Sequence, residues 1–285
     1  MTRVGTNPSK KQRRVWRPAR VSGLMVTHLP NTKGYHEVRL PVIETAVRSM
    51  VQNAGQLLEL FVWDNASCGA GVKLLRCLQA EGLITGLMLC SQNAGAALAK
   101  YWLTRLAPGE IVAYSDDDVY YYPGWLRPQL ELLEGFPRVG AVTGAPLRSM
   151  FDWGISSVLA FGQRPDARIS RGRFIPEQWE RDFARSVGRD PEILLRERAA
   201  SQDIVLEYAG LQAYGTAHHM QFVAWRDVLA QFEPDDPQLM GSQRAMDERI
   251  DNQGYLRLAT MQRYTRHIGN VLDADIQALA YQDGL

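Results

Sequence analysis

The chain of 285 residues carries 32 Lys and Arg against 31 Asp and Glu, and 46% of its residues are hydrophobic. This size and composition fit one large domain, or two closely packed lobes, with a substantial core. The balanced charge provides no overall field to attract nucleic acid, and no apolar run reaches the roughly 18 residues of a membrane span. We therefore expect neither a nucleic-acid-binding protein nor a transmembrane segment.

The N-terminal region is basic and lacks the apolar core of a signal peptide. Its cations are Lys10, Lys11, Arg13, Arg14, Arg17 and Arg20. We expect residues 1–20 to form a solvated, disordered tail, with weak contact to anionic lipid headgroups as the alternative. The three cysteines, Cys68, Cys77 and Cys90, have no zinc-type spacing and read as reduced thiols, which predicts a cytoplasmic protein.

From residue 21 to residue 145, short apolar runs alternate with segments of helical periodicity. The predicted strands are Val21–Thr27, Leu58–Trp63, Leu87–Cys90, Ile111–Ser115 and Val139–Thr143. The predicted helices between them cover about 38–51, 72–78, 96–106 and 124–133. This alternation predicts an α/β fold with a mostly parallel sheet flanked by helices.

The second half of the chain, 146–285, is less regular, and we expect it to form an acceptor lobe beside a nucleotide-binding lobe at 21–145. Its predicted helices are Gln178–Ser186, Glu192–Ala200, Val223–Phe232 and Ala245–Asn252. Several arginines lie among Pro, Gly and aromatic residues, from Arg164 to Arg173. We expect solvated loop charges there, with a mobile lid that closes over a diphosphate as the alternative.

Polar clusters close the predicted strands of the first half. They are Thr27-His28, Asp64-Asn65, Gln92-Asn93 and Asp116–Asp118. Right-handed crossovers place the carboxyl ends of parallel strands at one edge of the sheet, where open α/β sheets bind ligands. We therefore expect these clusters to lie together.

The acidic triplet Asp116-Asp117-Asp118 is the sharpest signal, because three adjacent carboxylates repel one another unless a cation compensates. Mg²⁺ and Mn²⁺ prefer such oxygen ligands and leave sites for phosphate. Alternation along an extended segment would let Asp116 and Asp118 point the same way and share one ion. A solvated acidic turn is the alternative.

The segment Ile111–Leu126, IVAYSDDDVYYYPGWL, resembles the Asp-x-Asp region of GT-A-fold glycosyltransferases, especially family 2-like enzymes. Phe61–Ser67, FVWDNAS, resembles the second-strand motif of these enzymes, and the run from Gln92 to Gly95 resembles their Asn-x-Gly loop. Thr27 stands where the family usually places a polar residue that contacts the nucleotide. The resemblance covers about residues 21–145.

The resemblance implies a donor site for a nucleotide-diphosphate sugar. Its nucleotide-sugar-binding residues would be Thr27, Asp64, Asn65, Asn93, Gly95, Asp116 and Asp117. Asp64 would accept a hydrogen bond from the base, which suits uracil and could serve guanine; the alternative is a turn or helix-capping residue before Ser67. Asp116, Asp118 and His267 would hold Mn²⁺ or Mg²⁺, although a lone histidine such as His267 is often structural.

The segment Met246–Tyr255, MDERIDNQGY, has the pattern in which inverting GT-A enzymes carry a catalytic carboxylate. Asp247 falls at that position, but Met246 replaces the usual Glu and Glu248 follows, so the choice of base between Asp247 and Glu248 stays open. The alternative is that both are ordinary acids in the first turn of a helix. At most one of His218 and His219 is expected to act, because neighbouring residues of a strand face opposite ways.

The acceptor is not specified by the sequence beyond a hydroxyl of a glycan, a lipid-linked compound, a peptide or a small molecule. Trp125, Trp153, Trp179 and Tyr214 are candidates for stacking on sugar rings. We predict a metal-dependent glycosyltransferase, inverting, that uses a UDP-sugar rather than a GDP-sugar. The alternatives are a retaining GT-A transferase, a nucleotidyltransferase that makes sugar nucleotides, and a non-catalytic binding protein. The nucleotidyltransferase is disfavoured, because the loop HLPNTKG at 28–34 lacks a Gly-rich, basic character.

Overall fold

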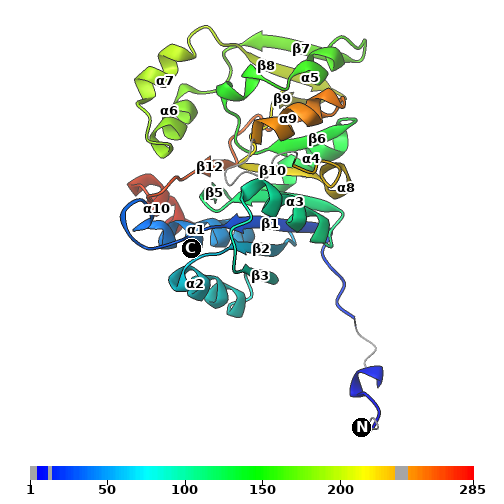
Figure 1. Ribbon diagram of the computed structural model, residues 1–285. Coiled ribbons are helices and arrows are strands. Elements are labelled where there is room, and N and C mark those ends of the chain that lie inside the picture. The colour runs from blue at the N-terminus through cyan, green and yellow to red at the C-terminus, as the bar shows by residue number, and fades with distance from the viewer. Residues whose placement is uncertain (1–4, 12–14, 235–242) are drawn as a thin grey trace.

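The computed structural model describes residues 5–11, 15–234 and 243–285. A ten-stranded sheet runs through the molecule in the order β3-β2-β1-β4-β10-β6-β11-β9-β8-β7, from the bottom to the top of Figure 1. The predicted α/β sheet flanked by helices is confirmed. Of the predicted cations of the N-terminal arm, Arg13 and Arg14 lie outside the described residues.

The first half of the chain builds the parallel part of this sheet. The strands β3 (Gly86–Cys90), β2 (Glu59–Asn65), β1 (Val21–Thr27) and β4 (Ile111–Asp116) pair in parallel. The helices that connect them are α1 (Arg39–Gln52), α2 (Gly69–Ala80) and α3 (Ala96–Leu106). Parallel neighbours need such crossovers, and as a result the carboxyl ends of β1, β2 and β4 share one edge.

The second half, which was expected to be less regular than the first, also contributes strands to this sheet. Its strands are β7 (Ala167–Gly172), β8 (Asp203–Tyr208), β9 (Leu211–Tyr214), β10 (Gln221–Trp225) and β11 (Leu256–Ala259). β10 lies antiparallel between β4 and β6 (Val139–Thr143), and β11 pairs with β6 in parallel. The two predicted lobes therefore share one continuous sheet.

Two predictions for the second half were wrong. The predicted helix Val223–Phe232 begins as strand β10 and continues only as the short helix α8 (Arg226–Leu229), because the apolar run of β10 is buried between two strands. The arginines at 164–173 are exposed as expected, but Arg168 and Arg171 lie on the edge strand β7 and not in a loop, at the opposite end of the sheet from β3. This strand lies far along the sheet from the acidic triplet, where it cannot act as a lid.

The remaining helices lie around the sheet or along the edge at which β1, β2 and β4 end. They are α4 (Leu126–Gly135), α5 (Ser156–Phe161), α6 (Glu177–Ser186), α7 (Pro191–Glu197), α9 (Gln243–Asn252) and α10 (Ala274–Gln282), with short 3₁₀ helices at Pro8–Lys11, Gly34–His36 and Arg148–Asp152. Within the described ranges, no helix is both long and apolar enough to span a bilayer.

A second, two-stranded sheet pairs β5 (Val119–Tyr121) with β12 (Thr265–His267). His267 stands opposite Val119 in this pairing, one residue after Asp118. This short sheet therefore joins two segments that are about 150 residues apart in the sequence.

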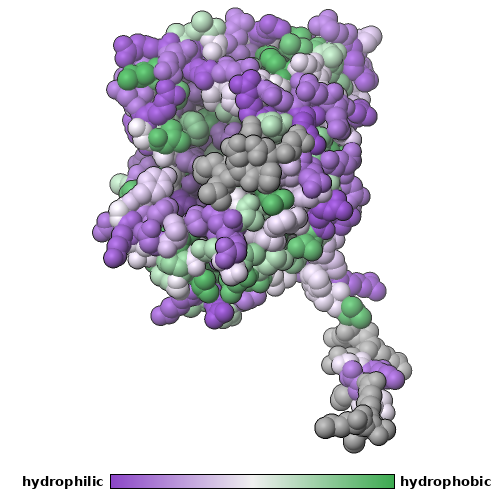
Figure 2. Space-filling view, in the orientation of Figure 1, coloured by the Kyte–Doolittle hydropathy of each residue, from purple (hydrophilic) through white to green (hydrophobic). Residues whose placement is uncertain are grey.

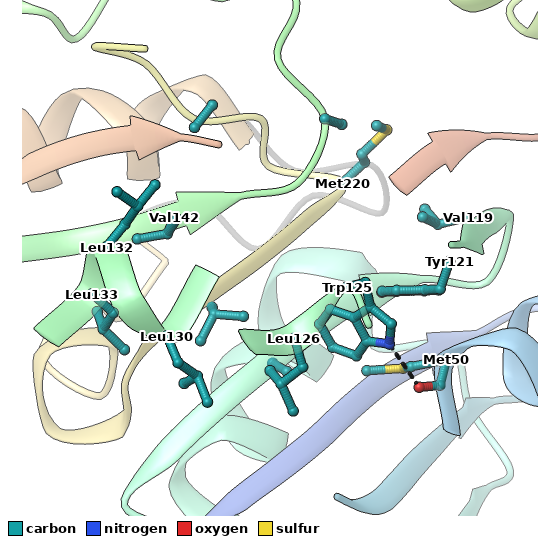
Figure 3. Packing of buried hydrophobic residues seen from close by; sticks show 14 of the residues in the cluster. Met50, Val119, Tyr121, Trp125, Leu126, Leu130, Leu132, Leu133, Val142 and Met220 are labelled. Carbon is teal, nitrogen blue, oxygen red and sulfur yellow. Dashed lines mark hydrogen bonds between the residues drawn. The ribbon is translucent and has the colours of Figure 1, made fainter. Parts of the chain in front are cut away.

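The core contains Trp125, which was a candidate for sugar stacking. Its side chain is fully buried, and its indole Nε1 donates a hydrogen bond to the Met50 carbonyl at 3.0 Å. Figure 3 shows Trp125 among Tyr121, Leu126 and Met50. Tyr214 is also buried in the core, so neither ring is free to stack on a sugar.

The predicted disordered tail is attached to the sheet at its end. Trp16 Nε1 donates to Glu59 Oε1 at 2.8 Å, and the Ala19 amide donates to Glu59 Oε2 at 2.7 Å. Arg20 forms an ion pair with Glu134 at 2.6 Å. Residues 16–20 are therefore fixed on the protein body, and the 3₁₀ helix at Pro8–Lys11 lies away from it (Figure 1).

Candidate functional site

The acidic triplet stands where β4 ends. Asp116 is the last residue of β4, and Asp117 and Asp118 form a turn that leads into β5. The premise that an extended segment points Asp116 and Asp118 the same way was therefore wrong. Asp116 accepts a hydrogen bond from the Tyr114 hydroxyl at 2.7 Å, and burial raises its pKa.

Arg39, the first residue of α1, neutralises part of the triplet from within the protein. Its guanidinium bonds Asp117 and, at 3.2 Å, Asp118 Oδ2. It also donates to the Gly269 carbonyl at 3.2 Å. Burial raises the pKa of Asp117 and the guanidinium opposes that rise, so a buried ion pair explains how adjacent acids are tolerated here.

His267 approaches Asp118 through the pairing of β12 with β5. Its Nε2 lies 3.5 Å from Asp118 Oδ1, and its Nδ1 lies 2.8 Å from Ser186 Oγ. Ser186 donates its only hydroxyl proton to the Phe183 carbonyl at 2.7 Å, so Oγ accepts from Nδ1–H. In the neutral ring, Nε2 therefore directs its lone pair toward a carboxylate oxygen.

These atoms fit a cation. The lone pair of His267 Nε2 and the negative charge of Asp118 repel each other, and an ion between them would attract both. Asp118 Oδ1 is buried and has no hydrogen-bond partner among the described residues, and the same is true of Asp117 Oδ2. Carboxylate oxygen and neutral imidazole are both ligands of Mn²⁺. No group of three His, Cys, Asp or Glu side chains in the described part of the chain lies close enough to hold an ion, so the predicted set of Asp116, Asp118 and His267 is not assembled as a threefold site.

The predicted base-binding region lies two strands away from the triplet. Asp64 pairs with Thr27 across β2 and β1, and Val26 pairs with Asp116 across β1 and β4. Asp64 accepts from Thr27 Oγ1 at 3.2 Å and from the Ser67 amide at 3.1 Å. The alternative role of Asp64 in the turn before Ser67 is thus present, and its contact with a base stays a prediction.

Asn65 and Asn93 close the neighbouring part of this edge. Asn65 donates to Asn93 Oδ1 at 2.7 Å, and Asn93 Oδ1 also accepts from the Gly95 amide at 2.8 Å. Gly95 precedes α3 with a φ of 80°, a backbone conformation that favours glycine. His28 contacts both asparagines, through the Asn65 carbonyl at 2.7 Å and Asn93 Nδ2 at 3.4 Å.

The candidate catalytic carboxylates have different surroundings. Asp247 is 3% exposed, and its Oδ2 lies 3.0 Å from Arg257, 3.3 Å from Trp153 Nε1 and 3.4 Å from His219 Nδ1. Glu248 is partly exposed and pairs with Arg244 at 2.7 Å, one turn earlier in α9. α9 begins by Gln243, so neither acid is in the first helical turn and that alternative was wrong.

Of the two adjacent histidines, His219 faces the candidate base. His218 is buried, accepts from the Met220 amide at 3.1 Å, and has its pKa lowered well below the usual value by burial. It therefore stays neutral inside the protein, and only His219 approaches Asp247.

Besides Arg39, two further cations near the carboxylates were missed by the sequence reasoning. Lys100 of α3 is buried, with Nζ 3.9 Å from the centre of the Tyr114 ring. Burial lowers its pKa to about 8, and the charges of Asp116 and Asp247 oppose that fall. Arg257 of β11 is fully buried and donates to the Ala217 carbonyl at 2.5 Å. Nothing in the local sequence signals that these strand and helix positions face carboxylates.

The profile of "Glycosyl transferase family 2" matches residues 35–189, more than half of the chain. The chain belongs to this family. The predicted resemblance is therefore confirmed, and the match includes the acidic triplet and Asp64. A comparison with curated protein sequences gave no match.

Of the following solved structures, the first supports the fold. A structure of GalNAc-T7 with UDP, GalNAc and Mn²⁺ has a TM-score of 0.52 at 13% identity and covers 87% of this chain and 42% of its own. TarS from S. aureus, residues 1–349, has a TM-score of 0.48 at 11% identity, and the match covers 87% of this chain and 60% of the TarS chain. The mannosyltransferase PcManGT from Pyrobaculum calidifontis, with GDP-Man and Mn²⁺, has a TM-score of 0.38 at 24% identity and covers 49% and 41%. The chain thus spans about two to three fifths of the length of these proteins.

Within this family 2 fold, the structure brings most of the predicted site residues to one sheet edge. The pairing of β1 with β2 and β4 places Thr27, Asp64 and Asp116 next to one another along this edge. The pairing of β5 with β12 brings His267 next to Asp118. The charges of Asp116 and Asp247 both act on the buried Lys100 and raise its pKa against the effect of burial, so the triplet and the candidate base share one neighbouring cation. Glu248 is the predicted residue that stands apart, with Arg244 as its partner.

Proposed function

We propose that the protein is a metal-dependent glycosyltransferase that moves a sugar from a nucleotide-diphosphate sugar, UDP-linked rather than GDP-linked, to an acceptor hydroxyl. Family membership supports the transferase class. The observation that carries the metal is the unpartnered, buried Asp118 Oδ1 facing His267 Nε2. We further propose that 21–145 serves as the donor lobe and 146–285 as the acceptor lobe, and that the protein acts in the cytoplasm.

In this proposal, Asp118 and His267 hold Mn²⁺ or Mg²⁺, and Asp116 and Asp117 lie beside the donor. The bound ion supplies Lewis-acid stabilisation to the negative charge of the leaving diphosphate. Thr27, Asp64, Asn65, Asn93 and Gly95 bind the nucleoside. Arg39 keeps the acidic turn in place through its bonds to Asp117 and Asp118.

Asp247 is the proposed general base for the acceptor hydroxyl, in an inverting displacement. Arg257 and Trp153 both contact its Oδ2 and fix its orientation, and a general base must be held within reach of the proton that it accepts. Trp153 and the partly buried His219 stand next to this oxygen on the acceptor side.

The test of the base is Asp247→Asn, with Glu248→Gln as the matched control. Asp247→Asn should lower the release of nucleoside diphosphate from a UDP-sugar by about 10²- to 10⁴-fold, the usual contribution of general-base catalysis. UDP binding, measured by titration calorimetry with Mn²⁺, should stay close to that of the wild type. Glu248→Gln should keep its activity, since Glu248 faces Arg244.

Full activity in Asp247→Asn would contradict the assignment, and loss of activity in Glu248→Gln alone would move the base to that residue. The stereochemistry is a separate question, because retaining enzymes lack a dedicated base. The anomeric proton coupling of the product distinguishes inversion from retention. Release of pyrophosphate in place of nucleoside diphosphate would favour the nucleotidyltransferase.

A further inference from the structure

An apolar groove opens at the β3 end of the large sheet, away from the candidate site. It lies between strands β2 and β3 and the C-terminal end of α3. Its lining residues are Phe61, Val62, Gly86, Leu87, Met88, Leu103, Leu106 and Ala107. We call it the edge groove, because β3 is the outermost strand of the sheet.

Large apolar side chains remain exposed around the edge groove. Leu106 is 59% exposed and Trp102 is 39% exposed, both on α3. Trp16 is 56% exposed, and its ring lies 6.5 Å from that of Phe61 in the groove wall. Single exposed apolar residues are ordinary, but a group around an apolar groove indicates an interaction surface.

The basic N-terminal arm begins at the rim of this groove. Trp16 is fixed there by its bond to Glu59, and Arg17 follows it. The first 36 residues of the sequence contain eight Lys and Arg and no Asp or Glu. Figure 2 shows apolar surface around the lower end of the molecule, beside the place where the arm leaves it. Arg20 is paired with Glu110 and Glu134, whereas Lys10 and Arg17 form no ion pair with the described residues. Exposed apolar residues and the positive charges of Lys10 and Arg17 therefore belong to the same end of the molecule.

We propose that the edge groove and the basic arm together bind the surface of an anionic phospholipid bilayer. Trp16, Trp102 and Leu106 would enter the boundary between headgroups and acyl chains, a location that suits Trp and Leu. Lys10 and Arg17 would remain among the anionic headgroups, to which each nearby cation adds roughly a fivefold factor in binding.

Charge favours a bilayer over a second copy of the chain as the occupant. A twofold contact through the edge groove would bring two basic arms together, and like charges repel. The described exposed residues of the arm offer no acid to compensate. An anionic bilayer has negative headgroups that complement the basic arm. It also has an apolar layer of acyl chains that takes up the exposed apolar side chains.

Such binding would leave the candidate donor site free. α3 begins at Ala96, next to Asn93 and Gly95, and ends at Leu106 in the groove. At 1.5 Å per residue, ten residues of helix separate these two ends by about 15 Å. The lipid surface is independent of the proposed transferase activity, and its test needs no substrate.

The test is co-sedimentation of the full chain with vesicles of phosphatidylcholine, with and without phosphatidylserine. Binding is expected only with phosphatidylserine and should weaken as salt rises. The double variant Lys10→Gln/Arg17→Gln should bind roughly 25-fold more weakly, from two factors of about five. The matched control Arg168→Gln/Arg171→Gln changes two exposed arginines of β7, at the far end of the sheet, and should bind as the wild type does.

The apolar part is tested by Trp16→Ser and Leu106→Ser, with Ile193→Ser of α7, 44% exposed, as control. The first two should weaken vesicle binding and the control should not. Trp16 lies outside the sheet, so its variant keeps the fold even if Leu106→Ser does not. Equal binding of the wild type and the Lys10/Arg17 variant would overturn the proposal. So would a dimer, detected by light scattering, that Trp16→Ser or Leu106→Ser dissociates.

Discussion

The hydroxyl of Ser186 determines which nitrogen of His267 faces Asp118. Because Ser186 donates to the Phe183 carbonyl, it accepts from His267 Nδ1–H and leaves Nε2 free for a cation. Partners of this kind orient a metal-binding histidine, and their loss typically costs 10- to 100-fold in metal affinity. Ser186 sits on α6, which the sequence predicts as a charged helix with no sign of this role.

We therefore expect Ser186→Ala to bind Mn²⁺ about 10- to 100-fold more weakly, measured by the electron paramagnetic resonance signal of free Mn²⁺. Ser170→Ala, on the exposed edge strand β7, is the control and should bind normally. In a His267→Ala background, Ser186→Ala should have no further effect, because the histidine that it orients is gone. Unchanged Mn²⁺ affinity in the single variant would show that the hydroxyl is dispensable.

At the scale of secondary-structure elements, a buried ion pair holds the second half together. Arg148 and Asp203 are both fully buried, and Arg148 Nε lies 2.8 Å from Asp203 Oδ1. Asp203 also accepts from the amides of Phe174 at 2.6 Å and Ile175 at 2.8 Å. The pair therefore connects the 3₁₀ helix at 148–152 and the segment before α6 to β8.

Asp203→Asn should lower the free energy of unfolding by about 3–5 kcal/mol, because it leaves the buried charge of Arg148 without its counterion. Urea denaturation measures the change. The control is Asp166→Asn, which removes the exposed pair with Arg164 and should cost no more than about 1 kcal/mol. Similar losses for the two variants would mean that burial gives the Arg148 pair no special importance.

The same elements show what the sequence can and cannot predict. Strands β1 and β6 and helix α3 have the predicted bounds, because each is a strongly apolar or strongly periodic segment. The end of β10, from Val223 to Trp225, is instead predicted as helix, because a short apolar run fits either structure until its neighbours are known. The burial of Arg148 has no local signal, since its partner Asp203 lies 55 residues away.

The residues of the candidate site likewise fall into those that the sequence could group and those that it could not. The strand-end residues Thr27, Asp64 and Asp116 could be grouped from the sequence, because parallel strands end at one edge. Arg39, Lys100 and Ser186 could not, since they reach the acidic turn or its partners from helices. Their positions depend on how those helices pack, and the local sequence does not encode that packing in a readable pattern.

At the scale of the whole molecule, the proposed donor site joins both halves of the chain across one sheet. A ligand that contacts Asp64 and Asn93 on one side and the Asp118–His267 pair on the other should stabilise the complete fold. UDP at 100 times its dissociation constant would add about 2.7 kcal/mol. For a protein of this size, that corresponds to a rise in the thermal midpoint of roughly 5–10 °C.

UDP with Mn²⁺ should give the full rise, and chelation of the metal should remove most of it. Asp118→Asn should retain only the metal-independent part, because it weakens the carboxylate that faces His267. A larger rise with GDP than with UDP would revise the choice of base but leave the metal site intact. If UDP raises the thermal midpoint equally with Mn²⁺, with a chelator and in Asp118→Asn, then nucleotide binding does not depend on the acidic turn. The proposed role of Asp118 would in that case be wrong.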